Sequence, residues 1–489
     1  MSPTVRRSVL TVTAAIVVLV GIAGVWVAHF RVQPPKIHYA KPSSALEAQR
    51  QDLDYFGRLL ALDRSFTPRR RAAAEQRLAA LENLPSSLPV PKLQTALMQI
   101  VALADNGHSR VDAIRDKGTL WTEPVRVTRF AEGFYVMRAT APYRDMLGGR
   151  IESIDGVPFD RVLALLETLR GGIEGLRRES AATFIILRDV LYGLGIAADP
   201  HISNWTVRSP DGRLVTRTIA AVPLTKREGP PADERWLSPE PLKRIGDWIS
   251  YAPASGVLPE SLSDYDRHFA LYPVAGTCAA AVRLQSIADA DGQQIRPFLL
   301  SAQAALEKSK PCAIVLDLRG NGGGDYTNTW DFTHALPHLT TGPIYILTDP
   351  QTFSAAITTA GFTMNAAGNR VTIVGEPVGD RLAFYSEGRR GCLPHSGICV
   401  AFQLARHDYA RPCLGWNCFW VDWLFPVRVR TFQPQVLIPR RFSDWNAGHD
   451  AAYEWCVSAI KEGRSHSGRA ETYAASARAS ERPRATREE

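Results

Sequence analysis

The sequence predicts an α/β protein with a mixed sheet and helices packed against it. Two short apolar runs, residues 313–316 and 344–347, have the length and composition of buried strands. The first run ends in a glycine-rich turn, and the second ends in a short turn with an apolar, helix-compatible stretch behind it. These observations predict strands that deliver loops to one edge of a sheet.

The first of these loops spans residues 317–325, Asp-Leu-Arg-Gly-Asn-Gly-Gly-Gly-Asp. Glycines let the backbone adopt conformations that expose its N–H groups at a single point. Such a loop can cradle phosphate, but the phosphate-binding pattern requires Gly-Lys-Ser/Thr, and here the glycines run into Asp325 and Tyr326. The missing lysine and the added acid argue against phosphate binding.

The second loop, residues 352–356, places Ser354 at a strand-to-helix junction. Taken alone, a serine before a helix is most often an N-cap. If the two strands are neighbours, however, one loop supplies backbone donors for an oxyanion and the other a hydroxyl. These are the minimum requirements for acyl transfer.

The order of the motifs resembles that of the carboxy-terminal-processing (tail-specific) serine peptidases and their tricorn-core relatives. In addition to the two loops, residues 371–380 resemble the family's Val-Gly-Glu-Pro-Thr-Gly strand and turn. Residues 393–397 resemble its Leu-Pro-Asn-Ser-Gly hairpin, and residues 282–289 its opening core strand. The resemblance covers roughly residues 245–460 and implies a crotonase-like catalytic core, with an expected activity of serine-type peptide hydrolysis.

The chain departs from this family at the catalytic base. Tail-specific peptidases use a lysine about 25 residues after the serine, and that count reaches Gly379 here. No lysine lies between Lys310 and Lys461, and the nearby Arg381 cannot be deprotonated in a protein. The serine–lysine pair is therefore excluded.

The tricorn-core branch uses a histidine instead, and residues 103–110, which contain His108, resemble the element that carries it. A neutral imidazole could accept the Ser354 proton, although His108 could also be an ordinary loop histidine. By family position, Glu387 is the expected acid partner, with Asp408 in reserve. Glu387 could equally be a solvated hairpin charge.

The expected oxyanion hole combines the N–H of Ala355 with that of Gly322 or Gly323. Asp317 and Arg319 are expected to brace the end of the strand rather than to do chemistry. No cofactor is expected, because the histidines fall into no recognisable metal-binding motif.

Upstream, residues 146–158 contain a Gly-Gly turn, an alternating strand and an Asp-Gly turn, which resemble the core of PDZ-like domains. Helical spacing of apolar residues between 44 and 104 predicts a small helical domain. The predicted organisation is a membrane anchor or signal (1–32), a helical domain (33–115), a PDZ-like domain (116–225), the peptidase core (226–460) and a disordered tail (461–489).

The N-terminus predicts export. Arg6 and Arg7 precede residues 8–30, which carry no Asp, Glu, Lys or Arg and are long enough to span a bilayer. An uncleaved anchor with the rest of the chain extracytoplasmic (periplasmic) is favoured over secretion after signal cleavage. A net charge of +8 without an aromatic and basic stripe argues against nucleic-acid binding.

The seven cysteines fit an oxidising compartment. A hairpin would bring Cys392 and Cys399 together, and Cys413 with Cys418 would close a smaller loop, so disulfides are predicted for both pairs. Of the other three, Cys312 is expected to be simply a buried thiol.

Two functions from different classes follow from the sequence. The first is a membrane-anchored serine peptidase with Ser354, His108 and Glu387 as its catalytic residues and a peptide or protein as its substrate. The second is a non-catalytic member of the fold that binds a ligand or peptide. The oligomeric state does not follow from the sequence.

Overall fold

The computed structural model describes residues 13, 21, 24–224, 237–240, 248–264 and 267–463, together with the backbone of 471–472. Most of the predicted anchor at 8–30 and nearly all of the predicted tail at 461–489 lie outside these residues. Within the described ranges no helix is at once long and apolar enough to cross a bilayer.

The N-terminal region is helical, as the apolar spacing predicted, and contains three helices. Ser44 caps the first of them by accepting a hydrogen bond from the backbone N–H of Glu47. Prolines begin the other two, where a missing N–H costs nothing. The helices are α2 (Ala45–Leu62), α3 (Pro68–Glu82) and α4 (Val90–Ala102).

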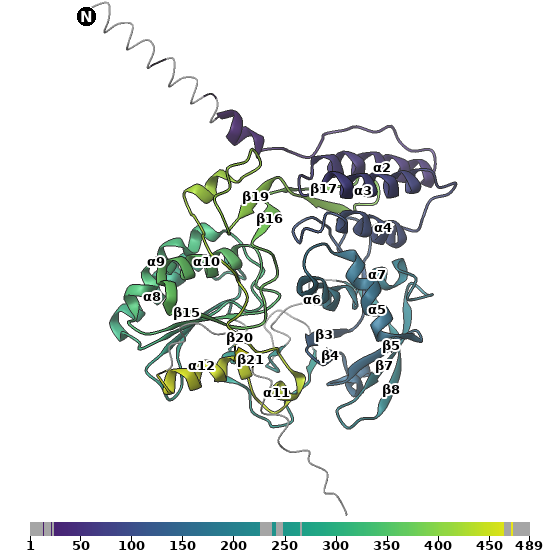
Figure 1. Cartoon of the computed structure of the whole chain (residues 1–489). Coiled ribbons are helices and arrows are strands. Elements are labelled where there is room, and N and C mark those ends of the chain that lie inside the picture. Colours follow the sequence, from purple (N-terminus) through teal and green to yellow (C-terminus); the bar gives the residue numbers. More distant parts are fainter. Residues whose placement is uncertain are drawn as a thin grey trace, which may run out of the picture.

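A second region is built on an antiparallel sheet of seven strands with helices beside it (Figure 1). The Asp155-Gly156 turn joins two of its strands, and both turn residues adopt positive φ angles of 48° and 78°. The strand and turns predicted at 146–158 are therefore present. The strands are β3 (Val125–Phe130), β4 (Gly133–Ala139), β5 (Arg150–Ile154), β6 (Val157–Pro158), β7 (Ile202–Arg208), β8 (Leu214–Ala220) and β10 (Ile249–Ser250), and the helices are α5 (Phe159–Leu166), α6 (Glu174–Phe184) and α7 (Arg188–Gly193).

The third region contains a mixed sheet with the order β11-β12-β13-β14-β15-β20-β21. Only the β11–β12 pair is antiparallel, and each of the other pairs is parallel. The expected mixed α/β sheet is thus confirmed. Its strands are β11 (Phe269–Pro273), β12 (Ala280–Leu284), β13 (Ile314–Asp317), β14 (Ile344–Thr348), β15 (Val371–Gly375), β20 (Val436–Leu437) and β21 (Glu471–Thr472).

Alternate residues of the central strands face two separate apolar cores. Leu316 and Ile346 pack into a core shared with α8 (Ile295–Ser309), α9 (Trp330–Leu339) and α10 (Ala355–Ala367). Val315 and Leu347 point to the opposite core, which contains α12 (Ala451–Lys461). Helices therefore cover both faces of the sheet (Figure 1), which explains why its central strands read as continuous apolar runs.

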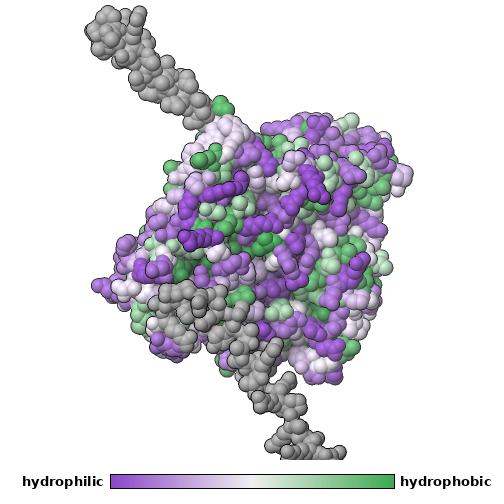
Figure 2. Space-filling view, viewed as in Figure 1, coloured by the Kyte–Doolittle hydropathy of each residue, from purple (hydrophilic) through white to green (hydrophobic). Residues whose placement is uncertain are grey.

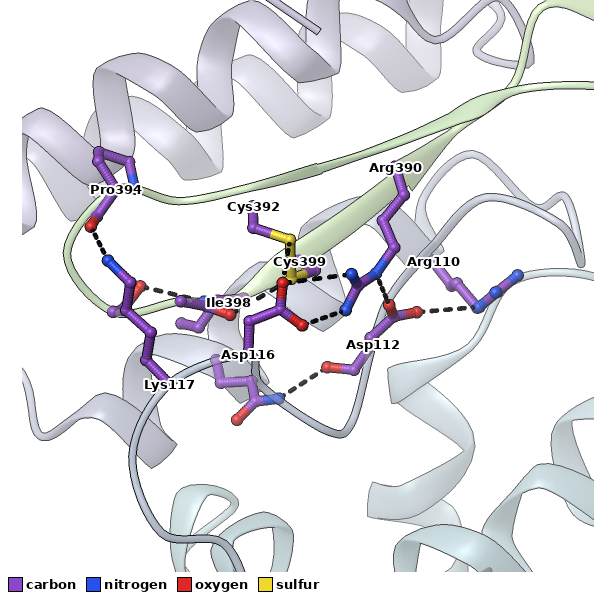
Figure 3. The surroundings of a disulfide bond; sticks show 12 residues. Arg110, Asp112, Asp116, Lys117, Arg390, Cys392, Pro394, Ile398 and Cys399 are labelled. Carbon is purple, nitrogen blue, oxygen red and sulfur yellow. Dashed lines mark hydrogen bonds and ion pairs between the residues drawn. A yellow bond between two sulfur atoms is a disulfide. The ribbon is translucent and has the colours of Figure 1, made fainter. Parts of the chain in front are cut away.

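Small sheets connect this core to the N-terminal helices. The strand order β1-β18-β17 joins β1 (Arg110–Val111) to the hairpin formed by β17 (Arg389–Cys392) and β18 (Cys399–Phe402). Arg390 lies between the carboxylates of Asp112 and Asp116, at 2.7 and 2.8 Å, beside the disulfide of this hairpin (Figure 3). The chain just after His108 is thereby held on the hairpin of β17 and β18.

Smaller elements complete the described chain. The pairs β16 (Ala383–Ser386) with β19 (Ala405–Asp408) and β2 (Trp121–Thr122) with β9 (Val222–Pro223) are antiparallel. The short helices are α11 (Phe442–Asn446), η1 (Ala141–Met146), η2 (Glu167–Leu169), η5 (Glu260–Leu262), η6 (Tyr326–Thr329), η7 (Gly368–Arg370) and η8 (Trp420–Trp423).

Candidate active site

Ser354 occupies the sharp turn between β14 and α10. Its backbone angles, φ 55° and ψ −125°, lie where residues with a side chain are strained. Its side chain caps no N–H of α10 and has no hydrogen-bond partner among the described residues. An ordinary helix cap would accept such a bond. This half-buried serine instead carries an unpaired hydroxyl on a strained turn, the geometry of a nucleophile elbow.

The glycine-rich loop lies against this turn because β13 and β14 are parallel neighbours, with Asp317 opposite Leu347. The Phe353 N–H donates to the Asn321 carbonyl at 2.9 Å. A Cβ atom added to Gly323 would lie 2.7 Å from the Ser354 Cβ and 2.9 Å from the Ala355 nitrogen. Only glycine permits this approach of the two loops.

The three predicted oxyanion donors differ in availability. The Gly323 N–H donates to the Asn321 side-chain oxygen at 2.9 Å, so it is already engaged. Within the described chain, the N–H groups of Gly322 and Ala355 make no hydrogen bond. Of the three predicted donors, Gly322 and Ala355 are therefore the two whose N–H groups are free.

His108 lies in the loop between α4 and β1, beside the residue that precedes the serine. Its ring stacks on Phe353 with centroids 4.2 Å apart, and Phe384 stacks on its other face at 5.2 Å. Neither ring nitrogen has a hydrogen-bond partner in the described chain. The fold thus brings His108 and the Ser354 turn together although 246 positions separate them, without forming a hydrogen bond from Ser354 to the ring.

The carboxylate next to His108 is that of Asp380. Its Oδ2 atom lies 3.5 Å from His108 Nδ1, while its Oδ1 atom accepts the N–H of Arg381 at 2.8 Å. Both side chains are buried, with exposures of 10% for His108 and 1% for Asp380. Burial lowers the pKa of His108 below its ordinary value, and the opposing influence of Asp380 does not reverse this. His108 is therefore neutral at pH 7 and able to accept a proton.

Comparison with solved structures identifies the same architecture elsewhere. Mature CPAF in complex with lactacystin superposes with a TM-score of 0.56 at 13% sequence identity, over 86% of this chain and 98% of that one. Mature CPAF alone gives 0.56 at 14%, over 86% and 97%. CPAF belongs to the C-terminal-processing, or tail-specific, protease family.

This chain has a tail-specific protease fold. The photosystem II D1 C-terminal processing protease is also similar, at 15% identity over 84% of this chain and 99% of that one, with a TM-score of 0.34. No protein-family model matches the sequence, and no curated protein matches it either.

Within this tail-specific protease fold, the position expected for the family's lysine cannot hold a side chain. A Cβ atom on Gly379 would lie 2.4 Å from the Pro350 carbonyl oxygen. The Gly379 N–H also donates to the Thr352 carbonyl at 2.9 Å, which fixes this backbone against the serine loop. The next residue is Asp380, so an acid that faces His108 follows the place where the lysine is missing.

The two acids predicted from the sequence, Glu387 and Asp408, do not pair with His108. Glu387 has a side chain that is 40% exposed, and its Oε1 atom is 3.8 Å from Nε2 of a different histidine, His407. Asp408, the reserve, pairs with Arg406 and Arg411. Sequence reasoning missed Asp380, and the only signal that could have found it was its place at the end of the Gly-Glu-Pro-Val-Gly-Asp turn.

Several contacts fix the His108 loop to the core. Arg381 binds the Asp105 carboxylate through two contacts of 3.0 Å, which accounts for its presence near the site. The Asn106 side chain bonds both the N–H and the carbonyl of Tyr385, at 3.1 and 3.0 Å. The Gln403 amide donates to the His108 carbonyl at 2.8 Å. These contacts therefore hold the His108 loop in position.

A second buried histidine network lies behind the site and was not predicted. Ser386 Oγ is 2.7 Å from His407 Nε2, and Asp422 Oδ2 is 2.8 Å from His407 Nδ1. Although burial opposes it, Asp422 raises the pKa of His407 above its ordinary value. His407 stacks on the far face of Phe384 at 5.0 Å, so the two histidines sandwich this ring.

The strand end and the serine loop are braced by ion pairs. Arg319 contacts Asp317 at 2.7 Å and Asp450 at 2.9 Å, the bracing role expected for Asp317 and Arg319. Farther along, Gln351 donates to Glu179 of α6 at 2.9 Å. Arg129 of β3 joins Glu179 at 2.6 Å to Glu376 at 3.0 Å. The antiparallel sheet that contains β3 is thereby tied to the loop that carries Ser354.

The cysteines form three disulfides in the described chain. Cys392 is bonded to Cys399 and Cys413 to Cys418, the two pairings that the sequence suggested. The expectation for Cys312 was wrong, because it is bonded to Cys278 at the start of the neighbouring strand. Cys456 remains a buried thiol. The Cys278–Cys312 pair is invisible in the sequence because 34 positions separate its members.

Proposed function

We propose that this chain is a serine peptidase of the tail-specific type, with Ser354 as its nucleophile and His108 as its general base. One observation carries the proposal: the strained Ser354 turn presents an unpaired hydroxyl beside two free backbone donors and a buried neutral imidazole. The proposal includes the crotonase-like assignment of residues 226–460 and the PDZ-like assignment of 116–225.

In the proposed reaction, His108 takes the Ser354 proton as the oxygen attacks the peptide carbonyl. The imidazole then returns that proton to the leaving amine. The N–H groups of Gly322 and Ala355 stabilise the oxyanion. Asp380 orients the ring and stabilises the imidazolium, a role that the sequence alone had given to Glu387.

The stacked rings constrain how the reaction begins. Phe353 and Phe384 cover both faces of His108, so the imidazole is confined to movement within its own plane. The hydrogen bond between Ser354 and His108 forms by such a shift, or by rotation of the serine side chain, when substrate binds. Catalytic hydrogen bonds that tighten only in the substrate complex are common.

The expected substrates are peptides or proteins outside the cytoplasm. This location depends on the anchor proposed for residues 8–30, with secretion after signal cleavage as the other possibility.

A serine-reactive fluorophosphonate probe tests the nucleophile. The wild-type chain should be labelled, and Ser354→Ala should not. Ser386→Ala is the matched control, because Ser386 also lies within hydrogen-bond distance of a histidine paired with an acid. Label that survives Ser354→Ala but is lost in Ser386→Ala would move the nucleophile to Ser386. Lactacystin offers a second probe, because CPAF has been solved in complex with it.

The second candidate is a non-catalytic ligand- or peptide-binding protein. The missing Ser354–His108 hydrogen bond and the missing lysine favour it. A folded wild-type chain that no serine probe labels, and that cleaves no peptide in a diverse library, would support binding without catalysis.

A further inference from the structure

An exposed cluster of tryptophans and leucines surrounds the loop closed by the Cys413–Cys418 disulfide. We define the tryptophan patch as Trp26, Leu414, Trp416, Trp423 and Leu424. Exposed fractions are 81% for Leu414, 54% for Trp416, 52% for Trp423 and 62% for Leu424. Large apolar side chains gathered at one place on a surface usually mark a site that contacts a partner or a membrane.

Interactions with the N-terminal helix order the patch. The Trp26 indole donates to the Trp416 carbonyl at 3.3 Å and packs on Trp423 with centroids 4.7 Å apart. His29 contacts the Asn417 side chain at 3.1 Å, and the Trp423 indole donates to the Cys413 carbonyl at 3.2 Å. The loop therefore presents its leucines and tryptophans from a fixed framework.

The tryptophan patch lies next to the N-terminal helix, and this position indicates which kind of surface it contacts. Residues 24–29 are helical and lie against the loop that follows β19, at the end of the molecule where the described N-terminal helix begins (Figure 1). The surface beside that helix is pale to green rather than uniformly purple (Figure 2). Trp26 thus joins the patch to the C-terminal end of the uncharged stretch 8–30.

Tryptophan is enriched where a membrane protein crosses from lipid to water, because its ring is apolar and its N–H is polar. Cations beside such a belt can contact lipid headgroups. Arg31 is exposed immediately after the stretch, and the Arg411 side chain is 75% exposed near the loop. This arrangement of apolar and basic groups is complementary to a phospholipid bilayer.

We infer that the tryptophan patch inserts into the interfacial region of the bilayer beside the N-terminal anchor. It acts as a second contact, in addition to the anchor proposed for residues 8–30, on which this inference rests. Two contacts fix the orientation of the catalytic body on the membrane, whereas a single helix followed by a linker would leave it free to rotate.

The test uses the full-length chain reconstituted in phosphatidylcholine vesicles with or without brominated acyl chains, which quench nearby tryptophan fluorescence. Wild type should show a quenchable fraction. Trp416→Phe/Trp423→Phe should lose more than half of it, because only Trp26 of the patch remains. The control Trp121→Phe, in the strand β2 far along the chain from the patch, should leave it unchanged.

A second variant protects the test against misfolding. Leu414→Glu/Leu424→Glu changes two exposed positions and keeps every tryptophan, so the thermal midpoint should stay near that of wild type while quenching falls. Equal quenching of wild type and both variants would overturn the inference and leave the patch available to a protein partner. If even the wild-type chain shows no quenching, both the membrane anchor and the inference are rejected. The proposed peptidase function is tested independently, by probe labelling at Ser354.

Discussion

The Nδ1 atom of His108 lies 3.5 Å from the Oδ2 atom of Asp380, and both side chains are buried. The distance is longer than a hydrogen bond but within the range of an ion pair. An imidazolium formed during the reaction would be stabilised by this carboxylate, because few solvent dipoles screen a buried pair. Asp380 therefore takes the orienting role in the proposed mechanism.

Replacement of Asp380 should distinguish it from Glu387 as the orienting acid. We expect Asp380→Asn to lower kcat by about 10²- to 10⁴-fold, since the tautomer and the imidazolium both lose their partner. Glu387→Gln should change kcat by less than about threefold, because its side chain lies near His407 and is 40% exposed. Steady-state peptide hydrolysis measures both, and the reverse ranking would restore Glu387 as the acid.

His108→Gln should abolish most of the activity while the chain still folds. Loss of a general base that acts as a unit with its nucleophile lowers kcat by about 10³-fold or more. His449→Gln, at an exposed histidine paired with Glu454, is the matched control and should leave kcat unchanged. Circular dichroism would verify folding, and wild-type activity in His108→Gln would exclude this histidine as the base.

The pH dependence follows from the lowered pKa of His108. Only the neutral imidazole accepts a proton, so kcat/KM should rise with pH through an apparent pKa below 6.5 and then level off. Asp380 raises the pKa of His108, so Asp380→Asn should move the acidic limb to still lower pH. A kcat/KM profile between pH 4.5 and 8.5 shows both effects, and an acidic limb above pH 6.5 would contradict them.

Gly322 allows the oxyanion hole to be tested with a matched pair of substitutions. A Cβ atom at this position meets nothing within 4 Å, and its φ is not positive, so Gly322→Ala should be tolerated with little change in kcat. Gly322→Pro removes the N–H and should lower kcat by about 10²- to 10³-fold with little effect on KM. Equal kcat values for the two variants would mean that the Gly322 N–H does not contact the oxyanion.

The Cys278–Cys312 disulfide should contribute more stability than the Cys413–Cys418 disulfide. Their sequence separations are 34 and 5, and constraint of the unfolded chain grows with loop length. We expect Cys278→Ala/Cys312→Ala to lower the free energy of unfolding by about 4 kcal/mol and the other double variant by about 2 kcal/mol. Urea unfolding under oxidising conditions gives both values, and the opposite order would show that strain or packing outweighs loop length.

Local sequence patterns were enough to predict those parts of the structure that depend only on neighbouring residues. The run at 313–316 followed by glycines predicted a strand and a tight loop, because apolar burial and glycine conformations act over a few residues. The strand-to-helix turn at Ser354 was predicted for the same reason, since it depends on neighbouring residues. The hairpin pair Cys392 and Cys399 also required only a short loop between its members.

The features that the sequence did not predict depend on contacts between residues far apart in the chain. Three such features are the pairing of Asp380 with His108, the His407 network and the Cys278–Cys312 disulfide. Each joins residues that lie far apart in the sequence, so no local pattern reveals that they are in contact.

The sequence by itself determined the strands, the serine turn, the glycine loop and the absence of the family's lysine. Only the tertiary structure decided which carboxylate faces His108, because packing of the 380-turn against the His108 loop selects Asp380 and directs Glu387 toward His407. Burial then lowers the pKa of His108 and so sets its protonation state. The extent of burial depends on all the residues packed around the ring, and these cannot be read from their positions in the sequence.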